Sequence, residues 1–187
     1  MCTYDITAAV EPLTKEELLM HTENADDCAS VYVGTYHKYN CGSLKGAWVN
    51  LETFDDEEEL MEFLHRLHAD ESDPELMMQD YMNFPRRFYS ESMNKYDFAK
   101  LYEWLNLDEE QRQICEEYWD EIDESASVEQ IIDSCVYSGK SDDFFDELAD
   151  EAMGDARDFL RNYFDYESWR RNCAYDYNVT SNYVFTL

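Results

Sequence analysis

The sequence predicts an α+β fold that forms an elongated chain of three small domains, α+β, helical and α+β, with an acidic surface. Runs of β-forming residues occur in both halves, a stretch with helical periodicity lies between them, and acidic residues far outnumber basic ones. The 187 residues suffice for one ordinary domain or for two to three small ones in series. An elongated arrangement is favoured because like charges on a compact surface repel each other.

The acidic excess belongs to a folded protein rather than to a disordered tail. The chain has 44 Asp and Glu against 14 Lys and Arg, a net charge of -30, yet 44% of its residues are hydrophobic and 16% are aromatic. Disordered acidic segments lack such aromatic content. The charge argues against nucleic acid and anionic membranes as direct partners and favours a basic protein surface.

The sequence also predicts a cytoplasmic protein without a leader peptide. No long apolar run opens the chain, and no stretch approaches the ~20 apolar residues of a membrane span. Six cysteines occur without a CxxC pair, which is typical of reduced thiols in a cytosol.

Residues 1–30 are predicted to form an N-terminal extension. Thr14 and Glu17 have the spacing of a capping box, so residues 18–20 can lie in a short helix. A mobile leader is an equally open interpretation of this segment.

Residues 31–92 are predicted to form an α+β domain with antiparallel strands and one helix. Residues 31–36 alternate and are rich in β-formers, and residues 47–51 form the returning strand after a glycine-containing turn. Residues 76–81 are a candidate edge strand.

The helix of this domain is predicted after Asp55 or Asp56, since either can cap it. It extends to about residue 69. Its apolar residues share one face, as expected for a helix on a core: Leu60, Phe63, Leu64 and Leu67.

Residues 93–133 are predicted to form a small helical domain. Apolar residues of the first helix recur at i, i+3, i+4 and i+7: Phe98, Leu101, Tyr102 and Leu105. A second helix is predicted from Asp108 to about residue 122, with three residues facing inward: Ile114, Tyr118 and Ile122. Ser127 and Gln130 can open a third, shorter helix.

Residues 134–187 are predicted to form a second α+β domain. Residues 135–137 are a candidate short strand, and residues 183–187 a terminal one. Ser141 can cap a helix with an apolar stripe: Phe144, Phe145, Leu148, Ala149 and Ala152. Residues 158–171 are predicted to be helical in two pieces.

Three groups of carboxylates are candidate partner-binding residues. One group precedes the first long helix, and two lie away from the apolar stripes of later helices. Their members are Asp55, Asp56, Glu57, Glu58, Glu59, then Glu109, Glu110, Glu116, Glu117, Asp120, Glu121, Glu124, and then Asp143, Asp146, Glu147, Asp150 and Glu151. Carboxylates at i, i+3 and i+4 stand about 5–6 Å apart at Cβ.

The charge invites a comparison with duplex DNA. DNA carries one charge per about 1.7 Å of axis, so a net charge of -30 corresponds to about 50 Å, or roughly 15 base pairs. Residues 96–187 carry 24 acids and 7 bases and are the more acidic half. Charge alone leaves two interpretations open, imitation of DNA or an acidic coat that keeps the protein soluble.

No catalytic, cofactor or metal site is predicted. Ser138-Gly-Lys-Ser141 resembles the end of a phosphate-binding loop, but Ser134 stands where the full pattern needs glycine. His65 and His68 have helical spacing, and together with His37 they could hold a zinc ion. The simpler interpretation is that these histidines lie on a solvated helix face. Among 44 acidic residues, any pair of carboxylates is uninformative as a catalytic pair.

Several segments resemble ArdA-type antirestriction proteins, in the same order over about residues 31–187. They are Val31–Asn40 (VYVGTYHKYN), Gly42–Trp48 (GSLKGAW), Glu75–Tyr81 (ELMMQDY) and Asn162–Arg171 (NYFDYESWRR). The last resembles the family's antirestriction motif, which has a Tyr-[Phe/Ile]-Asp-Tyr core and a downstream Arg-Asp. Asn172 stands where the family usually has that Asp, so no role is carried over to this position.

The resemblance implies homodimers of three small domains that mimic bent B-form DNA. Such proteins bind type I restriction-modification enzymes, mainly the methyltransferase core with its specificity subunit, and mobile genetic elements carry them to protect incoming DNA. The residues assigned to the motif and to a dimer interface in the last domain are Tyr163, Phe164, Asp165, Tyr166, Trp169 and Arg171. Their aromatic side chains suit a core or a dimer interface better than contact with a basic groove.

The expected function is therefore inhibition of a type I restriction-modification enzyme by occupying its DNA-binding groove, with no catalysis and no cofactor. An acidic chaperone or adaptor for a basic DNA-binding protein is the alternative from another class. An enzyme whose site is not local in sequence is a third. Competition with duplex DNA distinguishes the first from the other two.

Overall fold

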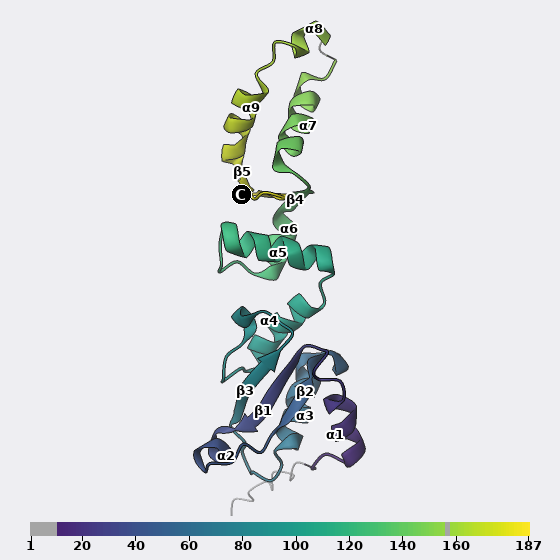
Figure 1. Cartoon of the computed structure of the whole chain (residues 1–187), viewed down its shortest axis with the longest axis vertical. Coiled ribbons are helices and arrows are strands. Elements are labelled where there is room, and N and C mark those ends of the chain that lie inside the picture. Colours follow the sequence, from purple (N-terminus) through teal and green to yellow (C-terminus); the bar gives the residue numbers. More distant parts are fainter. Residues whose placement is uncertain (1–10, 156–157) are drawn as a thin grey trace, which may run out of the picture. The chain divides into compact units, whose positions relative to one another are not determined.

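The computed structural model describes residues 11–155 and 158–187, and Figure 1 shows the arrangement of their helices and strands. Contacts between residues divide the chain into two compact units, with the boundary between Leu105 and Asn106. Each unit contains one antiparallel three-stranded sheet. The fold is α+β as predicted, and the division into three small domains stays a prediction.

The sheet of the first unit has β1 (Ser30–Thr35) between β2 (Ala47–Asn50) and β3 (Leu76–Met82). Val31 of the central strand pairs with Val49 of β2, and both side chains are fully buried. The three strands expected in this domain are confirmed, and β3 lies at an edge of the sheet.

Two long helices complete the first unit. α3 (Glu57–Leu67) is capped by Asp56 and buries three of its four predicted apolar residues: Leu60, Phe63 and Leu64. α4 (Lys95–Leu105) packs against α3. The buried Tyr102 hydroxyl of α4 donates to the Leu51 carbonyl at 2.8 Å, which ties the helix to the end of β2.

The helix predicted in the N-terminal extension is confirmed as α1 (Lys15–Thr22), with the capping box of Thr14 and Glu17 at its start. It packs through His21, which is buried and stacks on Phe54 with ring centroids 4.2 Å apart. Of the apolar residues of this helix, Leu18 is half-buried, whereas Leu19 and Met20 are exposed.

Three short helical segments of the first unit were not predicted. α2 (Tyr36–Asn40) follows β1 directly, where the sequence suggests a strand end and a loop. Its start is fixed by Thr35, whose hydroxyl accepts the N–H of Lys38 at 3.2 Å. The other two are 3₁₀ turns, η1 (Leu51–Thr53) and η2 (Arg86–Phe88).

The sheet of the second unit has β6 (Tyr183–Thr186) between β4 (Cys135–Ser138) and β5 (Tyr177–Val179). Val184 and Phe185 of the central strand are fully buried. β4 and β6 are confirmed predictions, whereas β5 was not predicted. Its three residues are all half-buried, so it lacks the alternation that marks a strand in the sequence.

The helices of the second unit are α5 (Glu109–Glu121), α6 (Val128–Ser134), α7 (Ser141–Met153), α8 (Asp158–Arg161) and α9 (Tyr166–Cys173), followed by the 3₁₀ turn η3 (Ala174–Asp176). α7 and α9 lie side by side and are joined at their far end through α8 (Figure 1). The two helical pieces predicted over residues 158–171 are thus confirmed. None of the described helices is long and apolar enough to cross a membrane.

Two details of α5 and α7 differ from the prediction. On α5, the predicted Tyr118 is half-buried and packs edge-on against the buried Phe185 with ring centroids 4.7 Å apart, and Trp119, which was not predicted to face inward, is buried and donates its indole N–H to the Ala126 carbonyl at 2.8 Å. On α7, Ser141 is the first helical residue and Lys140 occupies the N-cap position without a side-chain hydrogen bond. Ala152, which was predicted in the apolar stripe, is exposed. It lies in the last turn of α7, at the end of the helix farther from the sheet (Figure 1).

Candidate partner-binding carboxylates

The acidic residues 55–59 surround the start of α3. Asp56 accepts the N–H groups of Glu58 and Glu59 at 2.9 Å each, and the Glu58 carboxylate also pairs with Lys95. Negative charge here meets the positive end of the helix dipole, which is favourable. The exposed members are Asp55, Asp56, Glu58 and Glu59, and the half-buried one is Glu57. This group therefore has a local structural role beside any contact with a partner.

The carboxylates of α5 divide into two sets. The Glu110 side chain accepts the Ser138 hydroxyl at 2.8 Å. The half-buried Glu117 accepts the Thr180 hydroxyl at 3.1 Å and the Asn182 amide at 2.7 Å. These two acids attach α5 to the sheet. The other set is exposed and consists of Glu109, Glu116, Asp120, Glu121 and, beyond the helix, Glu124.

The carboxylates of α7 divide in the same way. Asp146 is half-buried and accepts the Arg170 Nε–H at 2.9 Å. Asp150 accepts an N–H of Arg161 at 2.7 Å and the Tyr166 hydroxyl at 3.0 Å. The other predicted members are exposed: Asp143, Glu147 and Glu151.

The segment that resembles the antirestriction motif lies where α8 ends and α9 begins. Tyr163 is 85% exposed, the highest exposed fraction among the large hydrophobic side chains of the described residues. Phe164 is half-buried and packs against Tyr166 and Trp169, with ring centroids 4.9 and 5.6 Å apart. The expected aromatic cluster is thus present, except that Tyr163 points out of it.

The polar residues of this segment have separate places. Asp165 is the N-cap of α9 and accepts the Ser168 N–H at 3.0 Å. Arg171 is exposed. The structure therefore assigns Asp165 a helix-starting role, whereas Arg171 is available at the surface.

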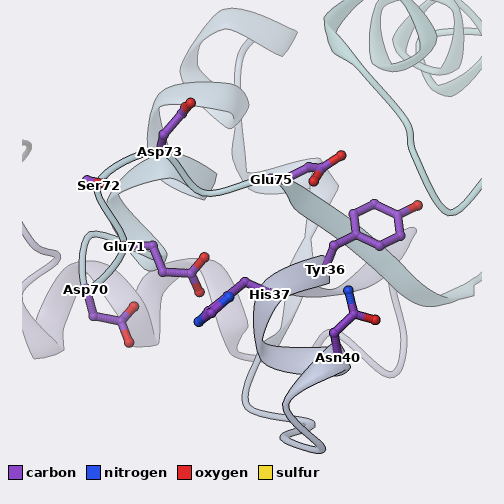
Figure 2. Close-up of a pocket in the computed structure, with 8 residues that line it drawn as sticks. All are labelled: Tyr36, His37, Asn40, Asp70, Glu71, Ser72, Asp73 and Glu75. Carbon is purple, nitrogen blue, oxygen red and sulfur yellow. The ribbon is translucent and has the colours of Figure 1, made fainter.

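A polar hollow of about 590 Å³ lies between α2 and the loop that precedes β3, and Figure 2 shows its lining residues. The lining from α2 is Tyr36, His37 and Asn40, and the lining from the loop is Asp70, Glu71, Ser72, Asp73 and Glu75. Four carboxylates among eight residues favour cations and disfavour phosphate groups.

A buried lysine lies beneath this hollow. Lys38 Nζ contacts Asp70 at 2.8 Å, Glu71 at 3.3 Å and His68 Nδ1 at 2.9 Å. The hydrogen bond from Lys38 lowers the pKa of Asp70 to about 2. Burial, and then the Lys38 charge, lower the pKa of His68 below its ordinary value of 6.5. A neutral His68 therefore accepts a hydrogen bond from the Lys38 ammonium group at Nδ1.

The histidines considered as a zinc set are not brought together. His65 Nδ1 donates to the Met61 carbonyl at 2.7 Å, and His68 Nδ1 accepts a hydrogen bond from Lys38. His68 is 2% exposed, so the interpretation of a solvated helix face is wrong for this residue. In the described part of the chain, no three His, Cys, Asp or Glu side chains are placed to hold a metal ion.

A comparison with protein families finds a match to the antirestriction protein family ArdA over residues 31–185. This chain belongs to the ArdA antirestriction protein family. The match confirms the resemblance and covers most of the chain. A comparison with curated proteins finds no match.

ArdA membership implies antirestriction and interaction with restriction-modification enzymes, and the family consists of inhibitors rather than known enzymes. The matched region begins in β1 and ends in β6, and it contains all three carboxylate groups and the motif segment. α1 lies outside it, so the His21 contact is an addition to the part shared with the family.

Sequence reasoning missed the basic residues that organise the acidic ones in this ArdA chain. Arg161 and Arg170 bind the carboxylates of α7, and Lys38 binds those of the loop before β3. The scarcity of basic residues could have pointed to these contacts, because residues 96–187 carry only 7 basic residues against 24 acidic ones. Each of the few arginines in such a segment is a candidate partner for a nearby carboxylate.

Proposed function

We propose that this ArdA-family chain inhibits type I restriction-modification enzymes by imitating duplex DNA. Its exposed carboxylates would occupy the groove that holds DNA phosphates, chiefly in the methyltransferase core with its specificity subunit. The observation that carries the proposal is the presence, in an antirestriction family member, of exposed acidic rows on α5 and α7. The proposal places the protein in the cytoplasm, where such an enzyme meets incoming DNA.

The physical chemistry supports a groove built for DNA as the target. Basic groups that neutralise phosphates also attract carboxylates, and exposed rows bring several within reach at once. Binding by such contacts weakens as salt screens the charges, over a Debye length of about 10 Å at 0.1 M salt. The enzyme's own affinity for DNA falls with salt for the same reason.

Competition against labelled duplex tests the proposal. The purified protein and a fluorescent duplex with the recognition site are mixed with a type I methyltransferase at about 50 and 200 mM salt, where electrostatic binding differs strongly. We expect the protein to displace the duplex, and its affinity for the enzyme to be weaker at the higher salt. Formation of a ternary complex, with the duplex still bound, would instead support the acidic adaptor.

We also propose a homodimer in which Tyr163 lies at the interface. A tyrosine that is 85% exposed beside a packed aromatic cluster is the kind of residue that dimer interfaces cover. A dimer doubles the number of carboxylates and would match roughly 30 base pairs by the charge comparison. Dimer formation also reduces the solvent exposure of this apolar surface.

A further inference from the structure

α7 carries two parallel rows of carboxylates, each with a spacing of i, i+4 and i+8. The inner row is Asp142, Asp146 and Asp150, and the outer row is Asp143, Glu147 and Glu151. Residues four apart lie on one face of a helix, and the two rows differ by one residue, or about 100° of rotation. Six acids on a 13-residue helix repel one another unless some of them are paired.

The inner row is paired by three residues of the following segment. Arg170 reaches both oxygens of Asp146, at 2.9 Å from Nε and 2.5 Å from Nη2, and lies 3.6 Å from Asp142. Arg161 and the Tyr166 hydroxyl share Oδ1 of Asp150, at 2.7 and 3.0 Å. Arg170 thus forms the two-pronged contact that fixes the orientation of guanidinium and carboxylate.

The outer row is left without such partners. The side chains of Asp143, Glu147 and Glu151 are exposed and make no hydrogen bond or ion pair within residues 11–155 and 158–187. The same helix therefore has one row whose three carboxylates contact two arginines and one row without an ion pair in the described part of the chain. A row held in place before binding loses less conformational freedom on binding than a mobile one.

We infer that Arg161, Tyr166 and Arg170 are positioning residues that hold α7 against α9 and so fix the outer row for contact with the basic groove. The inference rests on the proposed function and adds a role for the motif segment besides dimerisation. The ion pairs are partly exposed, so their direct contribution to stability is small. Their proposed effect is instead to fix the orientation of the outer-row carboxylates.

Loss of an arginine should strengthen binding to the enzyme if only the net charge matters, and should weaken it if the arginine positions the outer row. Arg170→Gln and the double variant Arg161→Gln/Arg170→Gln make the protein more acidic, so charge alone predicts tighter binding to a basic groove. Positioning predicts weaker inhibition, by roughly three- to tenfold for the double variant. Lys100→Gln is the control for the single variant, because Lys100 is exposed on α4 and its loss changes the net charge by one, as Arg170→Gln does.

The salt dependence separates positioning from a general loss of folded protein. Inhibition is measured for each variant between about 50 and 200 mM salt, and the slope of log affinity against log salt reports the charges engaged. We expect the double variant to have a shallower slope than the wild type and the control. Because the folded fraction can itself change with salt, it is measured for each variant at each salt concentration, and the affinity is calculated per folded protein before the slopes are compared.

Glu147→Gln/Glu151→Gln tests the outer row directly, since neither side chain has a partner in the described part of the chain. We expect weaker inhibition and a shallower salt slope, with a melting temperature no lower than that of the wild type because two mutually repelling charges are removed. The inference fails if the arginine variants inhibit as well as the wild type, or if the outer-row variant does so. The proposed function itself fails only if the wild type does not displace the duplex, so the two failures are distinguishable.

Discussion

Lys38 is a nearly buried cation, and the groups around it compensate its charge through ion pairs and a hydrogen bond. Two carboxylates and the neutral ring of His68 receive its three N–H groups. A protonated His68 would instead place a second positive charge 2.9 Å from the first. The folded state therefore opposes protonation of His68, as burial also does.

Stability should fall as the pH drops below about 6.5 because of His68. Its folded pKa is lowered, so its contribution to stability is complete above 6.5 and is lost as the unfolded chain takes up a proton first. One proton corresponds to at most about 1.4 kcal/mol per pH unit. Urea unfolding at pH 7.5 and 5.5 should show a smaller loss for His68→Gln than for the wild type. Equal losses in the two proteins would contradict this role of His68.

Tyr163 and Phe164 are neighbours with different surroundings, so their alanine variants should differ. Tyr163→Ala should leave the melting temperature nearly unchanged, because the side chain is 85% exposed, and should shift the protein toward monomer with weaker inhibition. Phe164→Ala should lower stability by about 1–3 kcal/mol through loss of packing on Tyr166 and Trp169. Light scattering measures the first effect and thermal unfolding the second. Dimeric Tyr163→Ala without inhibition would disprove the link between dimer and function.

At the scale of the element, α5 and α7 follow one plan. Each helix buries an apolar stripe, binds some carboxylates to the rest of its unit and exposes the others. On α5 the bound Glu117 is half-buried, whereas Glu116 beside it is exposed. On α7 the bound and the unbound rows differ by one residue and both lie on the polar face, so the amphipathic pattern alone does not distinguish them.

Glu116 and Glu117 are a matched pair for testing this division. Glu117→Ala should cost roughly 1–2 kcal/mol of stability, because the hydrogen bonds from Thr180 and Asn182 lose their acceptor. Glu116→Ala should change stability by less than about 0.5 kcal/mol, since it is an exposed surface position. Inhibition should respond more to Glu116→Ala once stability is allowed for. Equal stability of the two variants would show that the bonds to Glu117 contribute little.

At the scale of the whole molecule, a net charge of -30 acts on stability and on binding in opposite directions. Mutual repulsion of the carboxylates destabilises the folded state, whereas the same field attracts a basic partner. Salt screens both interactions.

The free energy of unfolding should therefore rise between about 10 and 150 mM NaCl, while inhibition weakens over the same range. Urea unfolding and the duplex competition assay measure the two quantities on one preparation. Stability that falls as salt is added would show that attractive ion pairs, such as those of Arg170, outweigh the repulsion.

The sequence by itself determined the α+β class, most of the helices and strands, and the family. These follow from short-range patterns, such as the capping box of Thr14 and Glu17 or the alternation before Thr35, which act between near neighbours in the chain. Family motifs are likewise runs of adjacent residues. α2 and β5 escaped prediction because elements of five and three residues are too short for a periodic pattern to show.

Only the tertiary structure decided which acids are paired and which are exposed. Asp146 meets Arg170 from 24 residues away, and Glu117 meets Asn182 from 65 residues away. Spacing within one helix cannot show such partners, because it describes a face of the helix and not what lies opposite that face. The physical reason is that pairing depends on distances through space, and folding alone brings these side chains within hydrogen-bonding range.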